Sequence, residues 1–194
     1  DNAEQRIYGR IGNLKTLKYK NPDLVLGILG CMAERLRKDL VEDKKVVDLV
    51  VGPDEYRRLP EYIDIAFNGD KGIGARLSRT ETYDDIEPHR EDGLNAWISV
   101  MRGCDKFCTF CVVPFTRGKE RSRSLQSIVA ELENLSARGF KDVTLLGQNV
   151  NSYLDEESTN NWDFADLLSA AAKVDRTLRI RFSTSHPQDI SDKL

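Results

Sequence analysis

The sequence predicts an α/β protein: a small N-terminal parallel-sheet domain, then the first part of a (β/α) partial barrel that is truncated. Two observations support this. Short apolar runs alternate with helical stripes on both sides of a charged stretch, and two predicted strands are followed by unusually long connections. We expect the first domain over residues 1–67, a linker over 68–95 and the barrel over 96–194.

The N-terminal part alternates helices and strands. Residues 3–17 carry a helical stripe that Pro22 ends. The residues that follow predict a strand at 24–29, a helix at 32–42, a second strand at 46–51 and a helix at about 55–67. Cys31 comes just after the first strand, where ligand sites of open parallel sheets gather. Residues 68–95 are rich in charge and turn residues, and we expect a short strand at 75–77.

The C-terminal part continues the alternation. We predict strands at 97–101, 143–146 and 178–183, and a helix over 124–138 that Gly139 suits as a C-terminal cap. Asp163 can cap the last helix. The connections 102–123 and about 147–162 greatly exceed the usual ~2–6 residues. Both follow the carboxyl ends of strands, which form the functional face of β/α barrels.

Composition narrows the class of protein. The chain has 194 residues, 40% of them hydrophobic, and a net charge of −3. It can therefore build a core, and only a local basic groove could attract nucleic acid. The longest apolar run, 24–33, is too short for a membrane span, which needs ~20 residues. Without a signal peptide, we expect a cytoplasmic protein. The missing initiator Met and the stop at Leu194 predict a fragment.

Three of the four cysteines form a C-x3-C-x2-C pattern at Cys104, Cys108 and Cys111. Three thiolates in one short loop favour a soft metal or an iron–sulfur cluster. A disulfide staple and three buried small hydrophobes are the alternatives, and the spacing differs from the paired C-x2-C of zinc sites. A four-iron cluster held by three thiolates leaves one iron open to a substrate or cofactor.

The cysteine pattern, with the aromatic Phe110 before its last cysteine, resembles the radical S-adenosylmethionine (SAM) superfamily. Residues 101–118 closely resemble the methylthiotransferase family within it. Residues 144–151 and 182–187 resemble the tRNA branch, which makes 2-methylthio-N6-isopentenyladenosine beside the anticodon. The resemblance spans essentially the whole chain.

This resemblance implies cofactors, partners and roles. Cys104, Cys108 and Cys111 would ligate the radical-generating cluster, and Cys31 would be one of three ligands of an auxiliary four-iron cluster, the other two lying before Asp1. SAM would supply both the methyl group and the radical. The partners would be a tRNA anticodon loop, an electron donor and a sulfur source. The auxiliary cluster would be incomplete in this fragment, and the rest of the barrel and an RNA-binding domain would follow Leu194, so we expect this fragment alone to be inactive.

Further residues are candidates for the site. We expect the backbone near Phe110, and the side chains of Gln148, Asn149 and Ser185, to contact SAM; loop-closing hydrogen bonds are the alternative for these side chains. The run Arg117, Lys119, Arg121 and Arg123 would contact RNA phosphate or the SAM carboxylate, or form a solvated face. His186 could simply close a turn before Pro187.

Other functions remain open. A sister enzyme could methylthiolate a ribosomal-protein aspartate, or threonylcarbamoyladenosine in tRNA. Outside this class, the cysteines could serve an electron carrier or a zinc-stabilised interaction module. The long loops and the open coordination site argue against both of these, since an electron carrier would fully ligate its irons.

Overall fold

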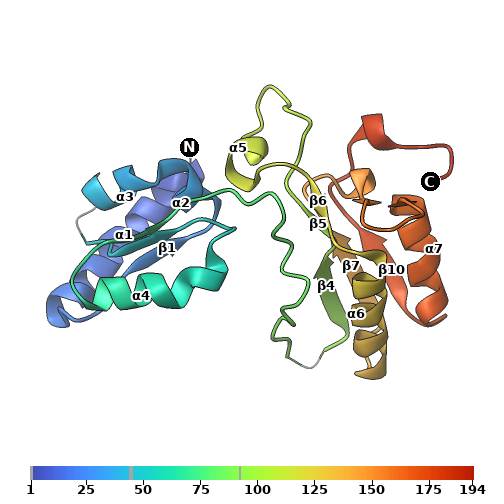
Figure 1. Cartoon of the computed structure of the whole chain (residues 1–194). Coiled ribbons are helices and arrows are strands. Elements are labelled where there is room, and N and C mark those ends of the chain that lie inside the picture. Colours follow the sequence, from blue (N-terminus) through green and yellow to red (C-terminus); the bar gives the residue numbers. More distant parts are fainter. Residues whose placement is uncertain (1, 44–45, 92) are drawn as a thin grey trace. The chain divides into compact units, whose positions relative to one another are not determined.

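The computed structural model describes residues 2–43, 46–91 and 93–194, and these residues form two compact units (Figure 1). The first comprises residues 1–78 with the short segment 115–117, and the second comprises 79–114 and 118–194. Each unit contains a three-stranded parallel sheet, which confirms the predicted α/β class. No helix among the described residues is long and apolar enough to cross a bilayer.

The first unit has a sheet of order β1-β2-β3 with helices on both faces (Figure 1). Its elements are α1 (Asn2–Lys20), β1 (Gly27–Leu29), α2 (Cys31–Leu36), α3 (Lys38–Asp43), β2 (Leu49–Val51), a 3-10 turn (Tyr56–Arg58), α4 (Leu59–Phe67) and β3 (Gly72–Gly74). Successive β2 residues face opposite sides. Val50 joins the core with α1, α2 and α3, whereas Leu49 and Val51 pack with α4.

Two expectations for this unit were wrong in detail. The strand expected at 75–77 lies at Gly72–Gly74, inside the expected linker, where it pairs with β2. Its glycines allow close packing, because a Cβ at Gly72 would lie 2.6 Å from the Tyr62 carbonyl oxygen. The helix expected over 32–42 is broken into α2 and α3 at Arg37, whose φ is 44°. Residue 92 of the expected linker lies outside the described residues.

The second unit has a sheet of order β10-β7-β4, built from β4 (Asn95–Ser99), β7 (Asp142–Leu146) and β10 (Arg179–Phe182). α6 (Leu125–Ala137) and α7 (Phe164–Val174) cover one face (Figure 1). The smaller elements are β5 (Met101–Arg102), α5 (Val113–Arg117), β6 (Arg121–Ser122), β8 (Leu154–Asp155), β9 (Trp162–Asp163) and 3-10 turns at Val150–Ser152 and Pro187–Asp189.

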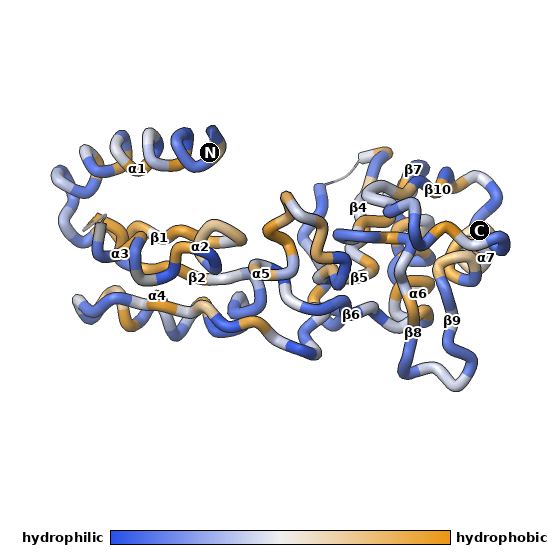
Figure 2. The backbone as a smooth tube through the Cα atoms, turned by 90° about the horizontal axis from the view of Figure 1, so that it is seen from above, coloured by the Kyte–Doolittle hydropathy of each residue, from blue (hydrophilic) through white to orange (hydrophobic). Residues whose placement is uncertain are grey.

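The expected caps of the two long helices are confirmed. Ser124 Oγ accepts a hydrogen bond from Ser127 N–H at the start of α6, and Gly139 follows its end with a φ of 91°. Asp163 and Asp166 form a reciprocal capping box on α7. The apolar faces of both helices bury Ile128, Leu132 and Leu167 in one core with β4 and β7. Hydrophobic and hydrophilic stretches alternate along the backbone of this unit in Figure 2.

Candidate functional site

The three clustered cysteines lie on one long loop, residues 103–120, which we call the cysteine loop. Short strands close its base, because β5 pairs with β6 in an antiparallel ladder. Cys104 N–H donates to Gly118 O at 3.1 Å just above this ladder. Gly103 has a φ of 80°, and a Cβ there would lie 1.9 Å from Lys119 O. Only glycine therefore fits where the two arms of the loop come together.

The cysteine loop follows β4 and β5, at the carboxyl end of the parallel sheet. The thiols of Cys104, Cys108 and Cys111 are all free, and Cys111 N–H donates to Cys108 O at 2.8 Å in a tight turn. Burial raises the pKa of the Cys104 thiol. Within the described ranges, no group of three or more Cys, His, Asp or Glu side chains is arranged to hold a single metal ion. Three free thiols within eight loop residues fit an iron–sulfur cluster by donor chemistry.

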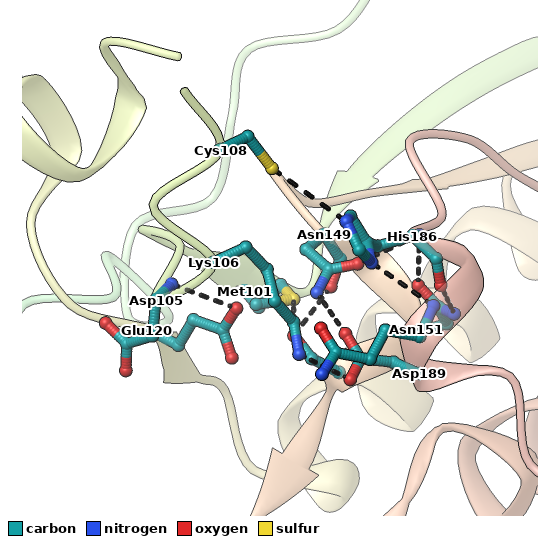
Figure 3. A network of polar contacts seen from close by, with 11 residues as sticks. Met101, Asp105, Lys106, Cys108, Glu120, Asn149, Asn151, His186 and Asp189 are labelled. Carbon is teal, nitrogen blue, oxygen red and sulfur yellow. Dashed lines mark hydrogen bonds and ion pairs between the residues drawn. The ribbon is translucent and has the colours of Figure 1, made fainter. Parts of the chain in front are cut away.

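The connections after β7 and β10 hold the cysteine loop in place (Figure 3). Gln148 Oε1 accepts a hydrogen bond from Gly103 N–H at 2.7 Å. Asn149, only 2% exposed, donates to Asp189 Oδ2 at 2.6 Å, while Lys106 Nζ lies 2.6 Å from the other Asp189 oxygen. The carboxyl edges of all three strands are thus joined by polar contacts. For Gln148 and Asn149 these are loop-closing bonds of the kind that the sequence left as an alternative to SAM contact.

From the sequence we assigned no role in the site to four members of this network: Lys106, Asn151, His186 and Asp189. His186 N–H donates to both Asn149 Oδ1 (3.1 Å) and Asn151 Oδ1 (2.8 Å), and its carbonyl oxygen accepts from Asn151 Nδ2 at 2.8 Å. Its Nε2 lies 3.8 Å from Cys108 Sγ. The repeated Asn at 149 and 151, directly after a predicted strand, was the one available signal.

The other expected cofactor contacts lie at the surface. The Phe110 side chain is 94% exposed near the tip of the cysteine loop, and Ser185 is exposed on the segment after β10. Their predicted contacts with SAM stay predictions.

The basic run divides between interior and surface. Arg121 and Arg123 are 6% and 8% exposed. Arg121 donates to Glu81 O and Lys119 O, and Arg123 to Ser99 O, Ser127 Oγ and Glu131 Oε2. Both guanidinium groups thus make hydrogen bonds within the fold, and the contacts of this run with RNA phosphate or SAM stay predictions. Lys119 is exposed and Arg117 half-buried.

Cys31 lies in the first unit, directly after β1, as the sequence predicted. It begins α2 and is partly buried. Arg117, from the segment 115–117 that packs with this unit, donates from Nε to Cys31 Sγ at 3.0 Å. The first unit thus presents one free thiol with a cationic neighbour at the carboxyl edge of its sheet.

Two protein families match segments of this chain, and several curated proteins match its whole length. Residues 98–192 match the Radical SAM superfamily, and residues 1–52 match the uncharacterized protein family UPF0004. A tRNA-2-methylthio-N(6)-dimethylallyladenosine synthase of Chloroherpeton thalassium is 55% identical over 100% of this chain and 43% of its own length. The corresponding synthase of Amoebophilus asiaticus is 51% identical, with 100% of this chain and 43% of the relative covered.

Among solved structures, the radical S-adenosylmethionine methyltransferase TsrM of Kitasatospora setae superposes with a TM-score of 0.58. The match covers 88% of this chain and 39% of that protein at 17% sequence identity, and so supports the fold. The chain spans about 43% of the length of the curated relatives given above. Superfamily membership implies a four-iron cluster and SAM. From its matched segments and its relatives, the chain belongs to the radical SAM methylthiotransferase family.

Proposed function

We propose that this chain is part of a cytoplasmic enzyme that methylthiolates C2 of N6-isopentenyladenosine beside the anticodon of tRNA. One observation carries the proposal: three free thiols lie at the carboxyl edge of the sheet, in a chain that aligns over its whole length with synthases named for this product. The names of these relatives favour this substrate over a ribosomal-protein aspartate or threonylcarbamoyladenosine.

In this proposal, Cys104, Cys108 and Cys111 hold the radical-generating cluster. When bound there, the cluster and SAM would supply the radical chemistry that hydrogen abstraction at adenine C2 requires. The chain's own residues position the reactants. Gln148 and Lys106 fix the cysteine loop through Gly103 and Asp189. Phe110 and Ser185 are proposed SAM contacts, and Lys119 a phosphate contact.

Cys31 is proposed as a ligand of the auxiliary cluster. Its partners must be residues other than Cys104, Cys108 and Cys111, because the cysteine loop uses those three. The full reaction also needs an electron donor and a sulfur source. Replacing Cys31 with Ala in the complete enzyme should abolish methylthiolation while reductive cleavage of SAM persists. Equal loss of both activities in a folded protein would contradict separate roles.

Anaerobic reconstitution of the chain with iron and sulfide tests the proposal. We expect an oxygen-labile four-iron cluster whose electron paramagnetic resonance (EPR) signal changes when SAM is added. Cys108→Ala should lose the cluster, and Cys31→Ala should keep it. Stoichiometric zinc without iron uptake would indicate a zinc module. A cluster whose EPR signal stays the same when SAM is added would indicate an electron carrier.

A further inference from the structure

His186 occupies a fixed position beside the cysteine loop (Figure 3). Its main chain makes three hydrogen bonds to the amides of Asn149 and Asn151, which are 2% and 7% exposed. His186 also closes the turn that we expected before Pro187, because it begins the 3-10 turn Pro187–Asp189 and its carbonyl oxygen accepts from Asp189 N–H at 3.1 Å. These bonds involve backbone atoms of His186, so they leave its imidazole ring available for another partner.

The ring itself is oriented by a local bond. His186 Nδ1 accepts a hydrogen bond from Gln188 N–H at 3.2 Å. In the neutral ring, a nitrogen that accepts carries no proton, so the proton lies on Nε2. Nε2 is the atom that lies 3.8 Å from Cys108 Sγ, and it therefore points an N–H at the sulfur.

The cysteine loop is held at a second point close by. Lys106, two residues before Cys108, pairs with Asp189, which also accepts from Asn149. Asn149 thus contacts both His186 and Asp189. The approach of the ring to the sulfur therefore depends on a connected set of buried and half-buried groups rather than on one flexible side chain.

We propose that His186 is a positioning residue for the radical-generating cluster: its Nε2–H donates a hydrogen bond to the Cys108 sulfur and stabilises the reduced state. This rests on the proposed function, in which Cys108 is a cluster ligand. A hydrogen bond to a ligating sulfur withdraws negative charge from it, and such bonds set the reduction potential of iron–sulfur clusters.

The test uses a Cys31→Ser chain, so that only the cysteine loop carries iron. His186→Phe keeps a ring and the backbone bonds but removes the donor, whereas His186→Gln retains an N–H. The matched control is His89→Phe, at the chain's other histidine, which is exposed. Each variant is reconstituted anaerobically, analysed for iron and sulfide, and titrated with EPR detection. Loss of one charge-assisted bond should lower the ratio of reduced to oxidised cluster on the order of tenfold at the unsubstituted midpoint.

We expect His186→Phe to shift the midpoint potential to a more negative value, His186→Gln to recover most of the shift, and His89→Phe to leave it unchanged. A loaded His186→Phe cluster with the unsubstituted potential would overturn the proposal and leave His186 as a turn residue. If the unsubstituted chain takes up no iron, the proposed function fails instead. Long-range 1H–15N spectra of the metal-free chain supply a test that needs no variant: they should show the Nε2-protonated ring, and an Nδ1-protonated ring would contradict the proposal.

Discussion

Lys106 Nζ lies 2.6 Å from Asp189 Oδ1, and this ion pair joins the cysteine loop to the segment that follows β10. Both side chains are about four-fifths buried, at 20% and 19% exposure. Asn149 donates to the second Asp189 oxygen. Three segments that are distant in sequence therefore share one carboxylate, and the position of the cysteine loop depends on it.

Replacing Asp189 with Ala should destabilise the chain by about 1–3 kcal/mol, because the buried Asn149 amide and the Lys106 ammonium lose their acceptor. The free energy of unfolding from urea titrations measures this loss, and limited proteolysis should cut the cysteine loop faster. Asp192→Ala, at an exposed residue nearby, is the control and should change stability by less than about 0.5 kcal/mol. An equal effect of the two substitutions would contradict a role of Asp189 in holding the loop.

Two glycines should respond oppositely to alanine. Gly103→Ala should cost about 1–3 kcal/mol or more, because φ is 80° and the new Cβ would lie 1.9 Å from Lys119 O. Gly12→Ala, in α1 with nothing within 4 Å of the added Cβ, should stabilise the chain by about 0.5–1 kcal/mol. Thermal unfolding monitored by circular dichroism distinguishes them. A stable, fully folded Gly103→Ala chain would show that the base of the loop can open.

Asp175 should make stability depend on pH in the acid range. Ser136 Oγ and the N–H and Oγ1 of Thr177 donate to its carboxylate, and these bonds lower its pKa to about 2. Its pKa in the unfolded chain is ~3.9. Because the folded value is the lower one, the stabilisation is present above about pH 4 and is lost as pH falls toward about 2.

Unfolding free energies of the unsubstituted chain and Asp175→Asn should therefore converge as pH is lowered from 6 toward 2. Asp192→Asn controls for the general effect of removing a carboxylate. A difference between the chain and Asp175→Asn that stayed constant with pH would show that the Asp175 charge contributes nothing to stability.

Binding of tRNA should be weak and sensitive to salt. The net charge is −3, and burial of Arg121 and Arg123 leaves few cations of the basic run at the surface. Lys119→Gln should lower affinity for tRNA and reduce the slope of log K against log[salt] by about 1. Lys173→Gln on α7 is the matched surface control. Tight binding of tRNA whose affinity does not change with salt concentration would indicate a recognition site elsewhere in the chain.

The sequence alone predicted features whose causes are local. Ser124, Gly139 and Asp163 mark helix ends because capping depends on residues within one turn. The two parallel sheets followed from apolar runs between helical stripes, and the three clustered cysteines pointed to their chemistry through spacing alone.

Tertiary structure decided the features that depend on partners far along the chain. β3 is Gly-Ile-Gly and has no apolar run, so only its pairing with β2 makes it a strand. In the sequence, Arg123 belongs to a basic run expected to contact a ligand or solvent. In the structure, its hydrogen bonds to Ser99 O and Glu131 Oε2 hold the side chain inside the fold. The proximity of His186 to Cys108 arises because parallel strands bring their carboxyl ends to one edge. Local propensity sets where an element begins and ends, whereas the partners of a polar side chain depend on which distant segments the core brings together.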